Sequence, residues 1–504
     1  MSWCARVGRD GVVTVPHGAD VETRGDRFVE GAWDREFERF EFDKARVLAG
    51  SGGLLRGGGC LFTAPFHPLE WLYVLEQTEA TFVSNSLVFV LQQAGDGLDL
   101  SYSDYTFDVL RTVRRGTRQR PGGLRTAQGG RVALYEACHL FIDKDLRLRR
   151  EEMPQGPAPR DYAEYFALLA GSTRRVVENA ADPARRAFYR PVAACSKGYD
   201  STASAALASL AGCREGVTFA RSGLPSGHPL LGVDKPLMDD SGAGALRALG
   251  MSVSEFERMN VVRMPGHPKA EFFYGLTAVT DAAHSSMQDA LRGSIFFTGR
   301  HGERSWGPTG RCKRQTFAEA DDCNLAGRAS SEFRLRLGYI QMPAPYIGAL
   351  HGPAIHRITH ADEMRPWSLG TGYYDRPIAR RLAEEAGVPR ELFGHVKAGG
   401  GEAAWELGDE SEADFQEFVR ERVPEKVRQR LNPRPIDERD QAHYKVKYLR
   451  TNYSHPPFAA FLLDVLQTDR LHRLWNSVYL YTFHWGFEKM APRYAGADRS
   501  WKNA

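Results

Sequence analysis

The sequence predicts an α/β protein in which a β-rich N-terminal part precedes a mostly parallel sheet and a helical C-terminal part. Residues 1 to about 155 contain short apolar runs separated by glycine-rich turns, which is typical of strands. Between about 190 and 300, apolar runs alternate with helix-like segments, which favours parallel strands covered by helices on both faces. Beyond about 320, apolar residues recur at helical spacing.

In the N-terminal part, the apolar runs 72–75, 81–91 and 131–142 are expected to be strands. The glycine-rich stretch 51–59 is expected to be a turn or flexible loop; no helix pattern follows it, so phosphate binding is the less favoured interpretation. The basic stretch 111–120 is expected to be a solvated loop, with contact to a polyanion as the alternative.

PQGPAP at 154–159 predicts a linker, which divides the chain into domains 1–155 and 156–504. After it we expect strands at 191–195, 217–220 and 294–298. Expected helices are 162–180, 202–211, 244–249, 270–291, 332–337, 376–386, 412–423 and 457–466.

Composition narrows the class of protein. The chain has 504 residues, of which 42% are hydrophobic, enough for a sizeable core. Its 66 basic and 63 acidic residues nearly balance, so the net charge does not indicate a nucleic-acid-binding protein. No stretch approaches the roughly 20 apolar residues that span a bilayer, and the N-terminus lacks a signal-peptide pattern. We therefore expect a cytoplasmic protein without a membrane or nucleic-acid partner. Seven cysteines without a CxxC pair indicate neither a zinc site nor a disulfide framework.

The most informative segment is PVAACSKGYDSTASAALASL, 191–210. It places a small polar loop between an apolar strand and a helix, where backbone N–H groups and the helix dipole favour anions. Ser196 and Ser201 add hydroxyl donors, Gly198 allows close approach and Lys197 adds positive charge. Asp200 suits an anion site if it holds a magnesium ion bridging phosphates. The alternative is an ordinary serine-capped helix with an aspartate in its first turn.

CSKGYDST resembles the SGGxDS pyrophosphate loop of the asparagine synthetase family of ATP pyrophosphatases and of its β-lactam and carbapenam synthetase relatives. VTFARSG at 217–223 resembles the second strand of that family, which places Phe219 near adenine. SIFFTGRHGERSWG at 294–307 resembles the strand and loop SGxGxDExxGG. There Gly299 matches the first glycine and Glu303 matches the metal-binding aspartate.

The segment 375–399 resembles the family's C-terminal helix and the lysine loop after it, with Lys397 on the lysine that touches the phosphates. Departures from the pattern are Lys197 for the second loop glycine, Arg300 for Glu or Tyr, Glu303 for Asp, and Arg304 for Glu. The loop keeps its capacity for phosphates, whereas the handling of the amine must differ from that in either reference group.

The resemblance also bears on residues 1–155. Asparagine synthetases begin with a glutaminase domain of the N-terminal-nucleophile type, whose nucleophile is a cysteine at position 2. This chain has Ser2, a much weaker nucleophile, followed by Trp3 and Cys4. We interpret 1–155 as a degenerate glutaminase-like domain, so glutamine is not the expected nitrogen donor. The alternative is a processed enzyme in which Cys4 becomes the N-terminal residue.

The resemblance implies a ligase that uses ATP and Mg²⁺ to adenylate a substrate carboxylate, releases pyrophosphate, and passes the acyl group to an amine or ammonia. Asp200 and Glu303 would hold magnesium, and Lys397 would offset charge on the phosphates. Arg300 would do the same or bind a substrate carboxylate, for which its planar fork is suited. His301 is a candidate base because an unperturbed imidazole titrates near neutrality; a structural loop histidine is the alternative.

Further features leave alternatives open. Glu332 either faces the site or forms a surface ion pair with Arg336. The aromatic segment 474–487 has three interpretations: it lines an apolar substrate pocket, it is part of the core, or it is a dimer contact. The third would make the protein a homodimer. Segment 362–381 is similar to bacterial synthetase relatives in polysaccharide or natural-product biosynthesis. The competing functions are adenylation of a carbonyl or nucleobase oxygen for another group transfer, and a pseudoenzyme that only binds nucleotide or a partner.

Overall fold

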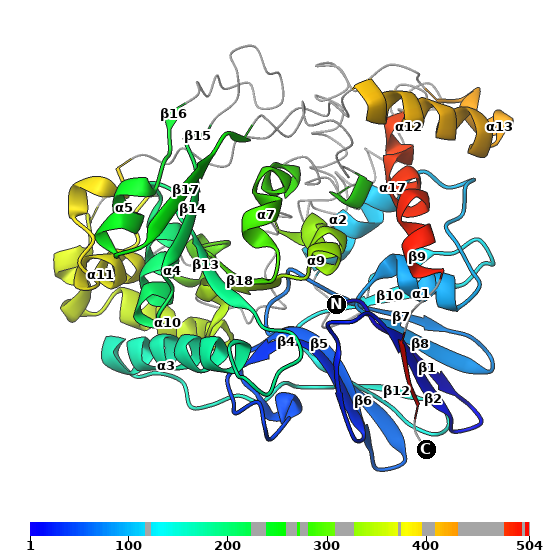
Figure 1. Ribbon diagram of the computed structural model, residues 1–504, viewed down its shortest axis with the longest axis horizontal. Helices are drawn as coiled ribbons and strands as arrows, with labels where there is room; N and C mark the ends of the chain where they lie inside the picture. The colour runs from blue at the N-terminus through cyan, green and yellow to red at the C-terminus, as the bar shows by residue number, and fades with distance from the viewer. Residues whose placement is uncertain are drawn as a thin grey trace, which may run out of the picture.

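The computed structural model describes residues 1–115, 122–222, 238–258, 270–272, 281–307, 327–370, 374–395, 409–431, 478–495 and 499–502. Two antiparallel sheets come first, followed by a five-stranded parallel sheet with helices and a helical C-terminal part (Figure 1). The expected mixed α/β class, with a β-rich first part and a parallel sheet after it, is confirmed at this level.

The first antiparallel sheet has seven strands in the order β20-β2-β1-β8-β7-β10-β9. These strands are β1 (Cys4–Gly8), β2 (Val13–His17), β7 (Leu72–Glu76), β8 (Ala80–Ser84), β9 (Gly122–Arg125), β10 (Arg131–Tyr135) and β20 (Arg499–Lys502). Strand β20 comes from the other end of the sequence and pairs with β2, Thr14 opposite Lys502. Because residues 478–495 and 499–502 pack on the first part of the chain, the division at 155/156 stays a prediction.

The second antiparallel sheet has six strands in the order β12-β11-β6-β5-β4-β3. They are β3 (Glu22–Arg24), β4 (Arg27–Trp33), β5 (Leu48–Arg56), β6 (Gly59–Thr63), β11 (His139–Ile142) and β12 (Leu148–Glu151). One buried cluster holds Trp3 and Val15 from the first sheet together with Phe28 and Phe62 from the second. Side chains from the two sheets share this cluster, so the sheets pack face to face.

The parallel sheet has the strand order β17-β14-β13-β18-β19, and each neighbouring pair is parallel. Its strands are β13 (Arg190–Ala194), β14 (Glu215–Phe219), β17 (Ser252–Phe256), β18 (Ser294–Thr298) and β19 (Ile340–Pro343). From β13 the chain adds β14 and β17 on one side, then returns to add β18 and β19 on the other. The strand order therefore reverses between β13 and β18, which is where open α/β sheets bind ligands.

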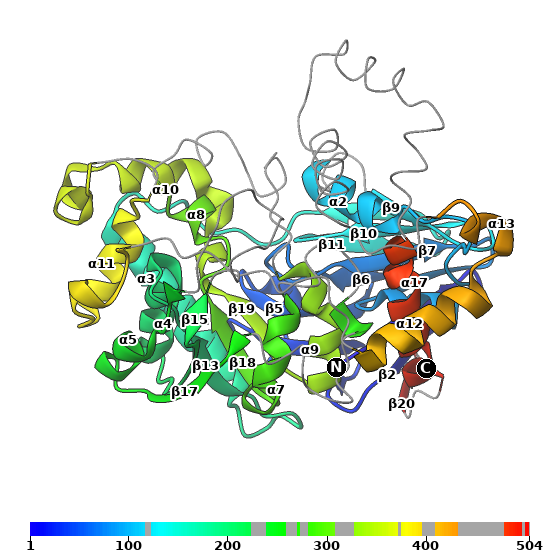
Figure 2. The same ribbon diagram turned by 90° about the horizontal axis from the view of Figure 1, so that it is seen from above.

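Helices flank the parallel sheet and lie along one side of the antiparallel sheets (Figures 1 and 2). The α-helices are α1 (Leu87–Gln93), α2 (Tyr105–Arg115), α3 (Tyr162–Ala180), α4 (Tyr199–Leu210), α5 (Ala243–Ala248), α7 (Gln288–Leu291), α8 (Gly302–Ser305), α9 (Ser331–Leu337), α10 (Gly352–Thr359), α11 (Pro377–Glu385), α12 (Asp409–Arg422), α13 (Glu425–Arg428) and α17 (Thr482–Met490). Short 3₁₀ turns are η1 (Phe42–Lys44), η3 (Ala270–Phe272), η4 (Ala283–Met287), η7 (Arg328–Ser330), η8 (Ala344–Tyr346), η9 (Ala349–His351), η10 (Asp362–Trp367), η11 (Arg390–Leu392), η12 (Val478–Tyr481) and η13 (Ala491–Tyr494). A two-residue ladder joins β15 (Arg221–Ser222) and β16 (Met238–Asp239).

The glycine-rich stretch 51–59 is not a loop, contrary to the prediction from sequence. Strand β5 runs through Arg56, and only Gly57 and Gly58 form the turn, with φ of 56° and 77°. The strand glycines make room for aromatic rings: a Cβ on Gly53 would lie 2.7 Å from Cζ of Phe28. These glycines therefore serve packing between strands.

Other predicted elements differ in kind or length. The run 81–91 is a strand only to Ser84; Ser86 then caps α1, its Oγ accepting from the Phe89 N–H at 3.1 Å. The run 131–142 is two strands, one in each antiparallel sheet. Residues 111–115 are the end of α2, and the described part of 270–291 is broken into 3₁₀ and α turns. The expected helix 457–466 lies outside the described residues.

Helix α3 has the predicted bounds, and β18 coincides with the predicted strand 294–298. The expected linker 154–159 has no regular structure. Among the described residues, no helix is both long and apolar enough to cross a membrane.

Candidate functional site

The loop after β13 folds around two serine hydroxyls. Ser196 Oγ lies 2.9 Å from Ser201 Oγ and accepts from the Gly198 N–H at 3.1 Å. Ser201 Oγ in turn accepts from the Ser196 N–H at 3.1 Å. The Thr202 N–H bonds to the Gly198 carbonyl at 3.3 Å, so the N–H groups at the very start of α4 have no acceptor within the helix.

Hydroxyl groups gather around Gly198. A Cβ placed on this glycine would lie 3.3 Å from Ser196 Oγ, 3.7 Å from Ser201 Oγ and 3.8 Å from the Tyr374 hydroxyl. Three hydroxyls beside the N-terminus of a twelve-residue helix offer hydrogen-bond donors and a favourable dipole to an anion. The loop thus has the chemistry expected of a phosphate cradle, and Tyr374 is a member that the sequence did not single out.

The loop after β18 touches the loop after β13. A Cβ on Gly299 would lie 2.3 Å from both the Asp200 carbonyl carbon and the Ser201 nitrogen, and one on Gly302 would lie 2.4 Å from Asp200 Cγ. Real Cβ atoms do not approach so closely, so both positions require glycine. The two predicted loops therefore meet at the reversal point of the sheet.

Asp200 and Glu303 extend from this contact. Asp200 Oδ1 lies 3.8 Å from Nε of Arg376, whose side chain is 3% exposed against 19% for Asp200. Glu303 follows Gly302 on α8 and is 28% exposed, with Oε1 3.9 Å from Nδ1 of the buried His301. His301 has a φ of 61°, a left-handed conformation that costs a non-glycine residue about 1–2 kcal/mol.

In the part of the chain that the structure describes, no three or more His, Cys, Asp or Glu side chains are grouped to hold a metal ion. Magnesium that binds together with a nucleotide needs fewer protein ligands, because one or two carboxylates and the phosphate oxygens suffice. Asp200 packs against Gly302 and Glu303 follows that glycine in the sequence, so the two carboxylates lie on adjoining backbone segments.

Arg300 is engaged inside the protein. Its Nη1 donates to Asp281 Oδ1 at 3.0 Å, and its Nη2 lies 3.3 Å from the ring of His284. Asp281 also accepts from the backbone N–H groups of Gly327 and Ala329. Burial raises the pKa of Asp281 despite the opposing effect of Arg300, and burial together with Arg300 lowers the pKa of His284 well below its ordinary value. Arg300 therefore ties the end of β18 to the segment around 327–329.

Phe219 ends β14, on the other side of β13, and is 8% exposed. The guanidinium carbon of Arg258 lies 4.3 Å from its ring centroid, and the His284 ring lies 6.1 Å away. Burial lowers the pKa of Arg258. Arg258 thus covers one face of the ring at the position predicted to be near adenine.

A third segment reaches the same loop. The Gly394 N–H donates to the Lys197 carbonyl at 2.7 Å, and Gly394 packs so closely on Tyr199 that a Cβ there would lie 2.3 Å from its ring. Arg390 donates to the Tyr199 hydroxyl at 2.9 Å. The Lys197 ammonium pairs with Asp239, which lowers the pKa of that carboxyl. Lys397 lies outside the described residues, so its predicted place is not tested.

Glu332 is not part of a surface ion pair with Arg336. It is 4% exposed and accepts from the Ser86 and Tyr494 hydroxyls, each at 2.5 Å, while Arg336 pairs with Glu271. Ser86 precedes Glu332 by 246 positions, so no local pattern announces this contact. Burial raises the pKa of Glu332.

Cys4 is buried in the first antiparallel sheet. Cys4 lies on β1, paired with Ser84 of β8, and is 1% exposed. Burial raises the pKa of its thiol, which disfavours the reactive thiolate. The alternative in which Cys4 serves as a nucleophile is therefore disfavoured.

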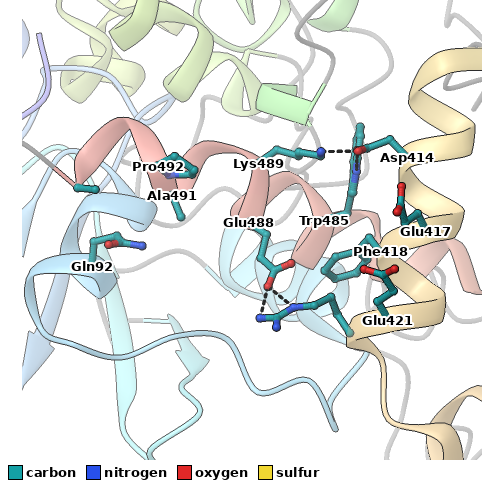
Figure 3. Close-up of a pocket in the computed structure, with 12 residues that line it drawn as sticks. Gln92, Asp414, Glu417, Phe418, Glu421, Trp485, Glu488, Lys489, Ala491 and Pro492 are labelled. Carbon is teal, nitrogen blue, oxygen red and sulfur yellow. Dashed lines mark hydrogen bonds and ion pairs between the residues drawn. The ribbon is translucent and has the colours of Figure 1, made fainter.

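The described residues of the aromatic segment, 478–487, pack into the core; Phe483 stacks on Tyr105 with ring centroids 5.3 Å apart. Beside them, a hollow of about 830 Å³ lies between α12 and α17 (Figure 3). Two ion pairs line it, Lys489 with Asp414 and Arg422 with Glu488. Figures 1 and 2 place it across the molecule from α4, so it is separate from the loops described above.

No protein-family model matches the chain, and comparison with curated proteins finds no match.

Proposed function

We propose that the protein is an ATP-dependent ligase that adenylates a substrate carboxylate and transfers the acyl group to an amine or ammonia, without hydrolysing glutamine. The observation that carries the proposal is the contact of Gly299 with the Asp200–Ser201 peptide. It joins the loops after β13 and β18 at the reversal point of a parallel sheet, where ligands bind in this fold class. The hydroxyls around Gly198 supply anion donors at the same place.

In the first step, the substrate carboxylate attacks the α-phosphorus of ATP and the bond to pyrophosphate breaks. The hydroxyls of Ser196 and Ser201 and the N–H groups that begin α4 hold the departing pyrophosphate, and Gly198 lets it approach closely. Asp200 and Glu303 would hold magnesium, which would supply positive charge to offset that on the phosphates. Positioning and charge compensation account for most of the catalysis in such a step.

In the second step, the amine attacks the acyl carbon, AMP leaves, and a base takes the proton from the nitrogen. His301, buried beside Glu303 on the loop after β18, is the candidate base. Lys397 compensates charge on the phosphates and on the acyl oxyanion. The hydrogen bond from Gly394 to Lys197 supports this role, because the three residues from Gly394 to Lys397 can span at most about 10 Å.

The family proposal is that of a glutaminase-inactive relative of the asparagine and β-lactam synthetases. It is supported by two antiparallel sheets packed face to face ahead of a parallel sheet, and by the burial of Cys4. The acyl acceptor is then an amine substrate or free ammonia. The acid belongs to a specialised metabolite or a sugar-acid precursor, as the similarity of segment 362–381 suggests.

The test is to incubate the protein with ATP, Mg²⁺ and a panel of carboxylic acids with amines, and to measure AMP and pyrophosphate. Substrate-dependent release of both supports the ligase. Asp200→Asn is expected to lower the rate at least about 100-fold, because it removes charge that holds the metal–phosphate complex. The matched control Asp289→Asn changes an exposed carboxylate on α7 and is expected to leave the rate unaltered. An unchanged rate in Asp200→Asn contradicts the proposal.

The ion pairs of Arg376 with Asp200 and of Asp281 with Arg300 favour a second candidate, a protein that binds nucleotide without turnover. In that case both charged groups serve the fold. Saturable ATP binding without acid-dependent pyrophosphate release would support it. AMP formation dependent on an acid would exclude it.

A further inference from the structure

Two histidines share one face of helix α10, which packs beside α8. His356 and His360 are four positions apart, and their ring centroids lie 4.3 Å from each other with a tilt of 50°. His356 is half-buried and His360 is exposed. Side chains four apart on a helix are neighbours on its surface, so the short ring distance follows from the spacing. Figure 2 shows α10 at the edge of the molecule.

The hydrogen bonding fixes which nitrogens are presented. His360 Nδ1 lies 2.9 Å from the His356 carbonyl, and because a carbonyl only accepts, Nδ1 carries the proton. The lone pair of the neutral ring is then on Nε2. Nδ1 of His356 is enclosed by protein, so Nε2 is the nitrogen of that ring that would reach a ligand. A ligating histidine in proteins usually has its other nitrogen bonded to a carbonyl in this way.

The position along the helix also favours a cation. Helix α10 ends at Thr359 and His360 is its C-cap, so the pair occupies the last turn. The carbonyl groups of a last turn carry partial negative charge, which attracts positive ions. Two imidazole nitrogens at about 2.0–2.1 Å from one ion are a bidentate set that suits late first-row metals, with Mg²⁺ preferring oxygen.

We propose that His356 and His360 form a bidentate surface site for a divalent late transition metal, Cu²⁺, Ni²⁺ or Zn²⁺, with water completing the coordination. The site is independent of the proposed ligase. A bound ion links two successive turns and is expected to stabilise the end of α10 in proportion to its occupancy.

Isothermal titration of the untagged protein with Ni²⁺ and with Zn²⁺ tests the proposal. One ion is expected per chain, with binding weakened as pH falls because both imidazoles must be neutral. His356→Ala and His360→Ala are each expected to weaken binding at least about tenfold, since even an outer-shell change costs 10–100-fold. His351→Ala, on the residue just before the same helix, is the matched control and should bind like the unaltered protein.

A second comparison keeps the number of histidines constant. Combining His360→Ala with Ala361→His moves the imidazole to a spacing of five, off the shared face, and is expected to abolish the site. Asp200→Asn should retain metal binding, which separates this site from the ligase. The proposal is overturned if the unaltered protein binds Ni²⁺ no more tightly than the double variant His356→Ala/His360→Ala, or if His351→Ala weakens binding as much as His360→Ala does.

Discussion

Arg334 and Glu30 form a two-bond ion pair in the interior, with Nη1–Oε2 and Nη2–Oε1 distances of 2.9 and 3.1 Å. Arg334 lies on α9 beside the parallel sheet and Glu30 lies on β4, so the pair joins the two parts of the chain. Glu70 adds a second carboxylate, 2.6 Å from Nη2. Burial raises the pKa of Glu70, although Arg334 acts against this. The cation is therefore required by two carboxylates at once.

Arg334→Met is expected to lower the free energy of unfolding by about 3–5 kcal/mol, because removing one partner leaves buried charge uncompensated. The measurement is the urea midpoint followed by circular dichroism. Arg365→Met is the control, since Arg365 and its partner Asp362 are 79% and 85% exposed, and little change is expected there. An equal shift in both variants would contradict the role given to Arg334.

Stability should fall as the pH is lowered through the range in which His67 is forced to ionise. His67 is buried, its Nε2 3.2 Å from the Gln341 carbonyl, and burial lowers its pKa to about 3. Between pH 6.5 and 3 the unfolded chain binds the extra proton, so stability is lost as pH falls. His67→Gln lacks this effect, and the stability difference between the two proteins should change by up to about 1.4 kcal/mol per pH unit.

The measurement is the urea midpoint of both proteins between pH 7.5 and 4.5. His484 is also buried, with its pKa lowered to about 4. It should likewise cost the unaltered protein stability as the pH falls from 6.5 to 4, and His484→Gln should lack that loss. Parallel pH profiles for the unaltered protein and His67→Gln would show that the His67 ring is ionised or hydrated in the folded state, contrary to its burial.

Gly299→Ala should disrupt the meeting of the two loops. Its Cβ would lie 2.3 Å from the Asp200–Ser201 backbone, so one loop must move. We expect a loss of at least about tenfold in ATP-dependent pyrophosphate release, since small misplacements of reacting groups are costly. Gly97→Ala, where an added Cβ meets no atom within 4 Å, is the control and should keep the activity. Full activity in Gly299→Ala would rule out a shared site.

Gly394 and Gly387 offer a matched pair. Both have positive φ, 74° and 92°, so alanine costs roughly 1–2 kcal/mol of backbone strain at each. Only at Gly394 does the new Cβ also collide with Tyr199. Gly394→Ala is therefore expected to weaken ATP binding in equilibrium titration, whereas Gly387→Ala lowers thermal stability alone. Identical ATP affinities in the two variants would contradict a link between Gly394 and the nucleotide.

The central strands and helices could be predicted because short apolar runs alternate with helix-like segments, the pattern of a parallel sheet covered by helices. Strands β13 and β18 and helix α3 follow this rule, and the loop at Ser196 was found from the order strand, small polar loop, helix. Residues 87–91 were misassigned because a short apolar run fits a strand or a buried helix equally. The cap at Ser86 was the available signal.

Partners distant in sequence could not be predicted. The glycines of β5 look like loop residues until Phe28 is seen against them. The spacing of four between Glu332 and Arg336 suggests a surface ion pair, yet the hydroxyl partners of Glu332 are Ser86 and Tyr494, both distant in sequence. Likewise Arg300 appears ready for a substrate, and only the fold brings Asp281 to it. Such pairings depend on which residues the fold brings together, and the spacing of residues along the sequence does not reveal this.

The pairing of β20 with β2 has a consequence for the order of assembly. During synthesis, residues 13–17 leave the ribosome long before residues 499–502, so the edge of β2 stays uncovered until those residues have been made. An open strand edge is a template for wrong pairing with other chains. Chains that lack residues 499–502 should therefore aggregate more readily than chains that contain them, and a chaperone that shields this edge would limit that aggregation.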